Sequence, residues 1–492
     1  MADKKVMVAG VEVALDHWIG GRRVSSDRRF ANASPIDGAE LGAVAAGGQA
    51  EAAMAVTAAA EAFPAWAALG AAGRLPILRR FASGIMTRAA EIAAVETADN
   101  GSLLAGNLHR MVPRAAQNIS FFAEWALGLN DHAIDHPEVV NNVRYDPSGV
   151  AALITPWNAP FMLTTWKVGP ALAAGNTVVI KPPEWAPLSC SLLADIAHAA
   201  GLPPGVLNVL QGIGEEAGDA LVNDARLSRI SFTGSPETAR IIGQAAARTL
   251  TPMSAELGGK SPFIVCADAD LDAAAQTVAG QYINAGQVCL AGTRILVEAS
   301  VEAEFLAKVR AAVGQMTVGD PRLPTTRVGP LIHPDHFARV AGFVDRAKAA
   351  GADLLWGGGR DAAGALYFQP TMFAGVSPGD EIAQDEVFGP VLTWQTFADD
   401  AEAVALANGT KYGLAGTLFC GNEARAMRIA EQVVAGTLWV NCFFVRDLAA
   451  PFGGARISGI GREGGTHSFD FYCDIKNIAV RKGSFASTGS AT

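Results

Sequence analysis

The chain has 492 residues, of which 38 are basic and 48 acidic, so its formal net charge is −10. At roughly 150 residues per domain, the length predicts two to four domains. Half of the residues are hydrophobic and 17% are charged, so the cores can be large and well buried. An acidic chain lacks the basic surface that binds a phosphate backbone, so nucleic acid is excluded as an expected partner.

Membrane insertion and secretion are also excluded as expectations. The N-terminal segment carries Glu12 and Asp16 before any long apolar run, unlike a secretory signal. The uncharged stretch 168–180 has 13 residues, short of the roughly 20 that a membrane helix needs. The six cysteines lie far apart, with no CxxC pair and no metal-ligand spacing. We therefore expect a soluble, reduced, cytoplasmic protein that interacts with no membrane and has no metal site.

The first half of the chain begins with turns and ends in a strand–helix alternation. Short strands and turns are predicted before residue 35, helices over 50–100 and 114–127, and a β-hairpin within 132–148. Strands are then predicted at 149–154, 177–180, 206–210 and 229–233, and helices at 162–174, 189–200 and 216–222. This alternation is typical of a doubly wound parallel sheet that binds a dinucleotide.

The second half of the chain repeats the alternation without repeating the sequence. Strands are predicted at 262–266, 293–297, 354–356, 414–419 and 437–441. Helices are predicted at 270–282, 300–315, 334–349, 399–408 and 422–434. The pattern indicates a second α/β domain, followed from residue 484 by a small, polar tail that we expect to be disordered.

The segment ISFTGSPETAR, residues 230–240, has the features of a phosphate-binding turn. Gly234 turns the chain after a strand, Ser235 can cap the next helix, and Pro236 suits its first position. The free N–H groups of such a helix attract phosphate. The alternative is an ordinary strand-to-helix turn.

Two charged residues follow the predicted strand 177–180. Lys181 and Glu184 stand at its carboxyl end, where ligands bind in parallel sheets. A carboxylate there can accept hydrogen bonds from both ribose hydroxyls of NAD and would repel a 2′-phosphate. The alternative is an ion pair in a solvated loop.

One cysteine lies in a loop suited to chemistry. Cys289 lies in the Gly-containing, uncharged segment NAGQVCLAG, where small neighbours would let a substrate approach the sulfur. A nucleophilic thiolate needs a base and an oxyanion pocket. Glu256, expected in another Gly-rich loop, could supply the base, and the side-chain amide of Asn158 could donate to the oxyanion.

Eight motifs in order resemble the NAD(P)-dependent aldehyde dehydrogenase superfamily over about residues 15 to 480. They are TPWNAPF, IKPPE, FTGS, ELGGKSP, GQVCLAGTR, EVFGPV, TLWVN and PFGGARISGIGREGG. The resemblance implies an α/β fold with a Rossmann-type cofactor domain at 1–125 and 149–258 and a catalytic domain at 259–457. A small β extension, 126–148 and 473–483, would join subunits into a homodimer or homotetramer.

The resemblance also implies residue roles and NAD as the cofactor. Cys289 would add to the aldehyde as a thiohemiacetal, with Asn158 and the Cys289 N–H as the oxyanion hole, and Glu256 would activate the water that hydrolyses the thioester. Lys167 and Glu463 would relay its proton. The residues implied to bind the cofactor are Thr155, Trp157, Lys181, Glu184, Gly234, Ser235, Leu257, Glu386 and Phe388.

The segments 112–125 and 443–472 resemble the muconate-semialdehyde branch of the superfamily. There Arg114 and Arg446 would hold the substrate carboxylate, which an arginine fork can bind bidentately, and Trp166 would line the pocket. The expected substrate is a carboxylated semialdehyde from aromatic catabolism. Arg114 could instead pair with an acid on its own helix, and Arg446 with Asp447 or a backbone carbonyl.

Three alternative functions remain open, and the sequence departs from the family pattern at one position. Trp166 and neighbouring aromatic residues could line a hydrophobic tunnel for an aromatic or aliphatic aldehyde; a CoA-acylating enzyme is disfavoured by Glu256, and a non-catalytic structural protein by Cys289, Glu256 and Asn158 together. The departure is Ala239, which stands where the family commonly has Gly. Its methyl is expected to weaken or reposition the cofactor.

Overall fold

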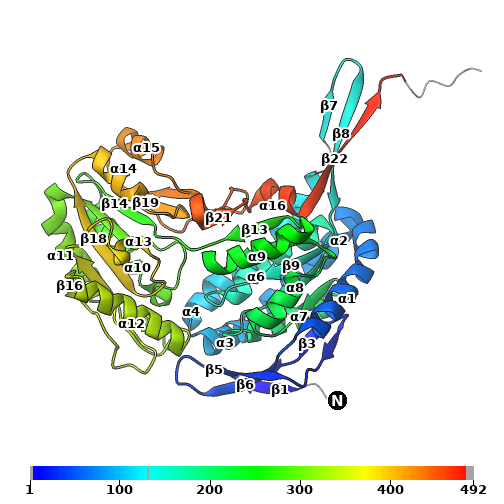
Figure 1. The fold of residues 1–492 in the computed structure, drawn as a ribbon, viewed down its shortest axis with the longest axis horizontal. Helices are drawn as coiled ribbons and strands as arrows, with labels where there is room; N and C mark the ends of the chain where they lie inside the picture. Colours follow the sequence, from blue (N-terminus) through cyan, green and yellow to red (C-terminus); the bar gives the residue numbers. More distant parts are fainter. Residues whose placement is uncertain (1–3, 130–131, 484–492) are drawn as a thin grey trace, which may run out of the picture.

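The computed structural model describes residues 4–129 and 132–483. Two α/β lobes lie side by side, and a thin β-ribbon projects from the larger one (Figure 1). The α/β class predicted from the sequence is therefore the observed one. The tail expected from residue 484 lies outside the described residues.

An eight-stranded sheet forms the centre of the larger lobe. Its strand order is β21-β13-β12-β9-β10-β11-β3-β4. The five central strands are parallel, and in chain order they run 3-2-1-4-5, the order of a dinucleotide-binding sheet. These strands are β9 (Val150–Ile154), β10 (Thr177–Lys181), β11 (Leu207–Val209), β12 (Leu227–Thr233) and β13 (Met253–Glu256). The flanking antiparallel strands are β3 (His17–Ile19), β4 (Arg22–Val24) and β21 (Gly459–Ile460).

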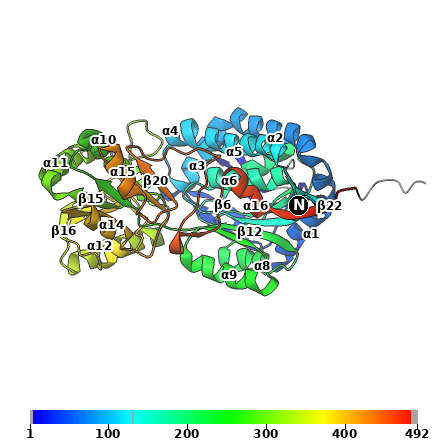
Figure 2. The same cartoon turned by 90° about the horizontal axis from the view of Figure 1, so that it is seen from above.

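Helices cover both faces of this sheet (Figure 2). One face packs against α1 (Gln49–Ala68), α8 (Asp219–Val222) and α9 (Pro236–Thr249). The other packs against α2 (Gly70–Thr87), α3 (Ala89–Asn100), α5 (Val112–Trp125), α6 (Pro160–Ala174), α7 (Leu188–Ala199) and α16 (Gly465–Tyr472). No single helix in the described residues is long and apolar enough to cross a membrane; α1 and α2 meet the combined length and hydropathy criterion only as a pair, across a 114° bend.

A seven-stranded sheet forms the smaller lobe. Its order is β16 (Asp353–Trp356), β17 (Thr371–Ala374), β18 (Val391–Phe397), β15 (Arg294–Glu298), β14 (Pro262–Val265), β19 (Ala415–Phe419) and β20 (Thr437–Val440). All neighbours are parallel except β16 and β17. The helices on its faces are α10 (Leu271–Gly280), α11 (Glu302–Val313), α12 (Pro334–Ala349), α13 (Glu381–Gln384), α14 (Asp400–Asn408) and α15 (Glu423–Ala430).

Antiparallel β-ribbons lie outside the two large sheets. The projecting ribbon contains β7 (His132–Asp135), β8 (Val139–Pro147) and β22 (Cys473–Arg481), and β22 pairs with β8 along its whole length. Two N-terminal hairpins contain β1 (Lys5–Val8), β2 (Val11–Ala14), β5 (Arg29–Ala33) and β6 (Glu40–Ala45). The remaining short helices are α4 (Leu104–Gly106) and the turns Asn107–Met111, Ala126–Gly128, Gly214–Gly218, Ile283–Gly286, Ala299–Val301 and Arg456–Ser458.

One expectation about local structure is wrong. Glu256 was expected in a Gly-rich loop, but it is the last residue of β13, paired with Thr233 on one side and Gly459 on the other. Two neighbouring strands hydrogen-bond this segment, so its backbone is fixed although glycines follow at once. The strand places the Glu256 side chain more rigidly than a loop could.

Candidate active site

A cavity of about 800 Å³ is lined by residues of both lobes. The carboxyl ends of β12 and β13 and the start of α6 supply one wall, and the loops before β15 and after β20 supply the other. Ligands bind at this edge of an open parallel sheet. The cavity is therefore where the fold would hold a ligand.

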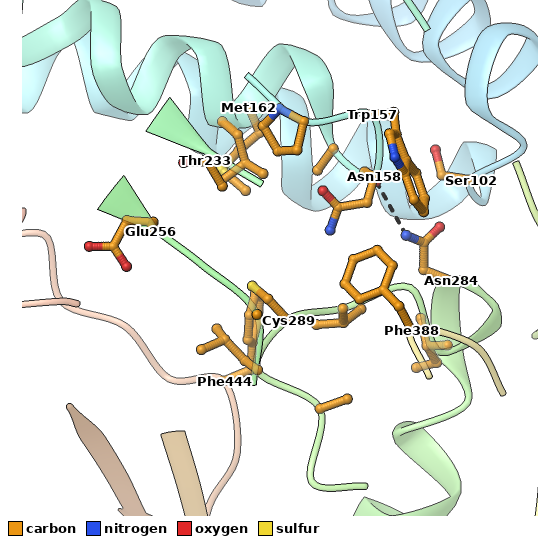
Figure 3. Close-up of a pocket in the computed structure, with 18 of the residues that line it drawn as sticks. Ser102, Trp157, Asn158, Met162, Thr233, Glu256, Asn284, Cys289, Phe388 and Phe444 are labelled. Atoms are coloured by element: carbon orange, nitrogen blue, oxygen red, sulfur yellow. Dashed lines mark hydrogen bonds between the residues drawn. The ribbon is translucent and has the colours of Figure 1, made fainter. Parts of the chain in front are cut away.

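Cys289, Glu256 and Asn158 meet in this cavity. Figure 3 shows the Cys289 sulfur and the Asn158 side-chain amide facing the same open space, with Glu256 at its edge and the Glu256 carboxylate turned away from Cys289. The Asn158 Nδ2 atom donates a 2.9 Å hydrogen bond to the carbonyl of Gln287, which leaves its second N–H free for a ligand. The three residues that sequence spacing could not join are thus brought together.

The Cys289 loop is held in place by tight backbone packing. Gly286 has φ +69°, and a Cβ there would lie 2.1 Å from the carbonyl oxygen of Gly389, so only glycine fits. Asn284, Phe388 and Phe444, which line the cavity, also have left-handed backbones. Such strain gathers where the surrounding structure imposes it, commonly at functional sites.

The Cys289 thiol is in an environment that disfavours its anion. Enclosure away from water raises its pKa to about 12, and the nearby Glu386 and Glu256 carboxylates act in the same direction. The Arg446 guanidinium opposes this shift. A cation placed in the cavity would therefore activate the thiol.

The Glu256 carboxylate is buried and has no hydrogen-bond partner for either oxygen in the described structure. Burial raises its pKa well above the usual value, as does the negative charge of Glu463. Lys167 opposes the shift. An unpaired carboxylate with a raised pKa can accept a proton from a water molecule.

Behind Glu256 lies a buried ion pair. The Lys167 Nζ donates to Glu463 Oε1 and to Ser231 Oγ, each at 2.9 Å, and the Trp166 indole N–H donates to the other Glu463 oxygen. Lys167 and Glu463 are 1% and 4% exposed. Their charges are therefore fixed near Glu256 with little screening by water.

Arg446 presents an unused donor at the cavity. Its guanidinium stacks on Phe452, 3.7 Å from the ring centre, and on Trp166 at 4.8 Å. The Nη2 atom is shielded from solvent and has no hydrogen-bond partner among the described residues. Burial lowers the pKa of Arg446 to about 10, and Arg114 contributes. Neither Asp447 nor a backbone carbonyl takes this donor, so an acidic ligand can.

Arg114 lies behind Arg446 and does not line the cavity. Its Nη1 atom donates to the Arg446 carbonyl at 3.3 Å and contacts Gln117 on its own helix at 3.5 Å. The acid expected on that helix is not its hydrogen-bond partner. Arg114 thus supports the backbone that carries Arg446.

The opposite end of the cavity contains most of the residues expected to bind the cofactor. Those lining it are Trp157, Gly234, Ser235, Leu257, Glu386 and Phe388. Ser235 caps α9 by accepting from the N–H of Thr238 at 3.2 Å. Glu386 accepts from the Gly259 N–H at 3.1 Å, and enclosure raises its pKa to about 7. A Cβ on Gly258 would lie 1.9 Å from a Glu386 oxygen, so a side chain at position 258 would displace this carboxylate.

Three of the expected cofactor residues lie outside the cavity wall. Thr155 is buried and accepts from Thr164 Oγ1 at 3.1 Å. Lys181 and Glu184 form a 2.7 Å ion pair, as in the alternative considered for this segment. Lys181 is the last residue of β10, the strand next to β9, and Glu184 follows the strand, so the pair lies at the ligand-binding edge of the sheet.

Sequence reasoning missed several lining residues, namely Arg110, Trp185, His336 and Arg339. The Nε2 atom of His336 lies 2.8 Å from the Phe388 carbonyl and must donate to it. Arg110 is exposed on the π-helical turn Asn107–Met111. The signal for Arg110 was a cation four residues before Arg114, but no motif marked it.

Comparison with known proteins places this geometry in a family. A family model described as "Aldehyde dehydrogenase family" matches residues 23–478. The 2-hydroxymuconic semialdehyde dehydrogenase of Pseudomonas sp. strain CF600 is 40% identical over 95% of this chain and 99% of its own. The 5-carboxymethyl-2-hydroxymuconate semialdehyde dehydrogenase of Escherichia coli is 41% identical over 92% and 98%. A P. syringae indole-3-acetaldehyde dehydrogenase structure, a mutant with NAD+ and IAA, has a TM-score of 0.94 at 38% identity and covers 96% of this chain and 97% of its own.

Proposed function

Because this chain belongs to the aldehyde dehydrogenase family and is an NAD-dependent enzyme of it, we propose that it oxidises a carboxylated, muconate-type semialdehyde to the corresponding acid. The observation that carries this proposal is Arg446, which lines the cavity and whose buried Nη2 atom has no hydrogen-bond partner among the described residues. An unpaired buried donor is costly, and a carboxylate would relieve that cost with a charge-assisted hydrogen bond.

The two ends of the substrate would contact different residues of the cavity. Arg446 would hold the carboxylate, with Trp166 and Phe452 fixing the guanidinium plane by stacking. Arg114 would act through the Arg446 backbone. The aldehyde carbon would then face Cys289, because both residues line one cavity. Relatives named for muconic semialdehydes support this class, and we infer a role in aromatic catabolism.

The first chemical step would belong to Cys289. The Cys289 thiol would lose its proton to solvent, its sulfur would form a bond to the aldehyde carbon, and the carbonyl oxygen would become an oxyanion that accepts from the free N–H of Asn158 and from the Cys289 backbone N–H. A fixed donor at the place where charge develops lowers the barrier. The product of this step is a thiohemiacetal on the protein.

The second half of the reaction would use Glu256. Once the aldehyde carbon has lost its hydrogen, the enzyme carries a thioester. Glu256 takes a proton from water, the water oxygen attacks the thioester carbon, and the carbon–sulfur bond breaks to release the acid and the Cys289 thiol. Lys167 and Glu463 lie where they can relay the proton that Glu256 has taken.

The residues at the other end of the cavity fit NAD. The N-terminus of α9 follows the Gly234 turn with Ser235 as its cap, which suits a pyrophosphate. Glu386 would hold the nicotinamide ribose, Glu184 and Lys181 the adenosine ribose, and Trp157, Thr155, Leu257 and Phe388 the walls of the groove. When bound, NAD supplies the acceptor for the hydride that leaves the aldehyde carbon.

A hydrophobic aldehyde is the second candidate substrate. Met162, Phe443 and Phe444 line the cavity with Trp166, and one structural relative is named for indole-3-acetaldehyde. In that case Arg446 would only position the aromatic wall. The unpaired Nη2 atom favours the carboxylated substrate.

The assembly and the compartment are also part of the proposal. We infer a homodimer or homotetramer formed through the ribbon of 126–148 and 473–483. Most of β22 and β7 is exposed, and the unpaired N–H and C=O groups of an edge strand can pair with a strand of another chain. The free cysteines suit a reducing cytoplasm.

The substrate proposal is tested by NADH formation with a carboxylated semialdehyde and a neutral analogue of similar length. Wild type should prefer the carboxylated aldehyde, and Arg446→Ala should lose that preference by roughly 2–5 kcal/mol, the effect of truncating a buried charged partner. Equal rates for both aldehydes, unchanged in Arg446→Ala, would support the hydrophobic alternative.

The role of Cys289 is tested separately. Cys289→Ala should abolish turnover of every aldehyde, whereas Cys190→Ala, which removes a buried thiol of α7, should retain it. Turnover by Cys289→Ala would overturn the mechanism while leaving the substrate test intact.

A further inference from the structure

Two cysteines and an aspartate meet at the carboxyl edge of the seven-stranded sheet, outside the catalytic cavity. Cys266 follows β14 and Cys420 follows β19, and these strands are parallel neighbours in which Val265 pairs with Phe419. The Cys266 N–H donates to the Phe419 carbonyl at 2.9 Å. The two thiols are therefore side by side although they are far apart in the sequence. Asp268 follows in the loop after Cys266.

The three potential ligand atoms lie close enough together to share one metal ion after a small movement. The two sulfur atoms and one Asp268 oxygen lie within 4.8 Å of one another, and the Cys420 Sγ to Asp268 Oδ1 distance is 3.5 Å. A zinc ion with sulfur at about 2.3 Å and oxygen at about 2.1 Å separates these ligands by about 3.6 Å. Only a small movement of the Cys266 sulfur toward the other two atoms would bring all three ligands to this separation.

The backbone holds the ligands in this arrangement. Asn441 donates to the Cys420 carbonyl and accepts from the Cys420 N–H, both at 2.9 Å. A Cβ at Gly421 would lie 2.2 Å from the main-chain oxygen of Asp268, so the two loops are packed directly together. The ligands are therefore preorganised, and binding costs little rearrangement.

The surrounding charges favour a divalent cation. Arg425 is the partner of three carboxylates, Asp268 at 3.8 Å, Glu298 at 2.9 Å and Asp400 at 2.6 Å. Three negative charges around one positive charge leave a local excess of two. The Asp268 side chain is 43% exposed while both thiols are buried, so an ion can enter from the carboxylate side and keep a water molecule as its fourth ligand.

We propose that Cys266, Cys420 and Asp268 form a binding site for a thiophilic divalent cation such as Zn²⁺, separate from the active site. Binding replaces the two S–H protons by metal–sulfur bonds and releases both protons to solvent. The bound ion ties the loop after β14 to the loop after β19 and thereby stiffens this edge of the second sheet.

The test uses a full-length reference protein with Cys289→Ala and Cys442→Ala, because those two half-buried thiols would also bind Zn²⁺. After removal of metal, calorimetric titration with Zn²⁺ should show one equivalent bound and about two protons released, and the Tm should rise. Cd²⁺ should bind with the same stoichiometry and give a thiolate charge-transfer absorption.

Matched variants test whether Zn²⁺ binds at these three residues. Cys266→Ser and Cys420→Ser should each abolish stoichiometric binding, and Asp268→Asn should weaken it roughly tenfold or more, whereas Cys190→Ser, a buried thiol in the other sheet's helix layer, should change nothing. Failure of the reference protein to bind Zn²⁺, or equal binding by Asp268→Asn, would overturn the proposal even if a cysteine variant failed to fold.

Discussion

The two ends of the catalytic cavity are constructed differently. At the substrate end the ligand-facing groups are charged side chains held by buried partners, with Arg446 stacked on Phe452 and Glu463 bound to Lys167. At the cofactor end they are mainly backbone features, the Gly234 turn and the N-terminus of α9. The Glu386 carboxylate, next to Gly258, is one charged side chain among them.

This difference indicates how each end tolerates change. A helix terminus binds phosphate through N–H groups that every residue type supplies, so single substitutions there should have small effects. A buried charge depends on one partner, and removal of that partner leaves an uncompensated charge. Substitutions at the substrate end should therefore have the larger effects.

After the loss of turnover expected for Cys289→Ala, the largest effect is expected for Glu256→Gln. Without the base, hydrolysis should slow by roughly 10²–10⁴-fold, whereas formation of the thioester needs no carboxylate at this position. One turnover of NADH should appear as a burst, and mass spectrometry should find the acyl group on Cys289. Glu124→Gln, an exposed carboxylate paired with Arg79, is the control. Loss of the burst together with turnover would place Glu256 in the first step instead.

Glu463→Gln should affect both stability and pH dependence. The variant leaves the Lys167 charge without its partner, which should lower the free energy of unfolding by about 3–5 kcal/mol, measured by denaturant titration. Removal of the Glu463 charge should also lower the raised pKa of Glu256. Because the base is active above its pKa, the acid limb of the pH–rate profile should move to lower pH.

The control for Glu463 is Glu381→Gln, which removes an exposed carboxylate paired with Arg346. It should leave both the unfolding free energy and the acid limb almost unchanged, since exposed pairs contribute little. If Glu463→Gln moved the limb to higher pH, the charge of Glu463 would not be what raises the Glu256 pKa.

Arg446→Lys should separate charge from geometry at the substrate end. Lysine keeps a cation but loses the planar fork, so the preference for the carboxylated aldehyde should fall by roughly 10–100-fold, the equivalent of one charged hydrogen bond. The measurement is kcat/KM for the paired aldehydes. Arg346→Lys, on the exposed side of α12, should keep the preference, and an unchanged preference in Arg446→Lys would mean that charge alone selects the substrate.

Much of the fold followed from local sequence signals. Strands β9, β10 and β12 and helices α6, α7 and α12 lie within a few residues of their predicted bounds, because apolar runs and Gly or Pro boundaries encode them. Strands β17 and β18 were missed, since 371–374 and 391–397 lie between loops without a regular helix pattern. β13 was interpreted as loop because the glycines at 258 and 259 follow it so closely.

The site could be predicted only in part, for a physical reason. Spacing identified Gly234 and Ser235, whose features are adjacent in the chain, but not the convergence of Asn158, Glu256 and Cys289, which depends on the packing of two lobes. Local features of the sequence suggested those three residues as candidates, and the resemblance supplied their roles and Arg446. The Cys266–Cys420 pair was not found by any spacing rule, because adjacency across parallel strands leaves no trace in sequence distance.

Ala239→Gly should give the smallest effect and tests the cofactor end. Ala239 is buried on α9, where it packs with the hydrophobic cluster under the sheet. Removal of the methyl should let the first turn approach the pyrophosphate more closely and tighten NAD binding about two- to fivefold, within about 1 kcal/mol. Glycine in a helix costs roughly 0.5–1 kcal/mol of stability, so Ala246→Gly, buried further along the same helix, is the matched control. Calorimetric titration of both variants with NAD should show tightening only in Ala239→Gly; equal affinities would mean that α9 already approaches the cofactor as closely as a glycine would allow.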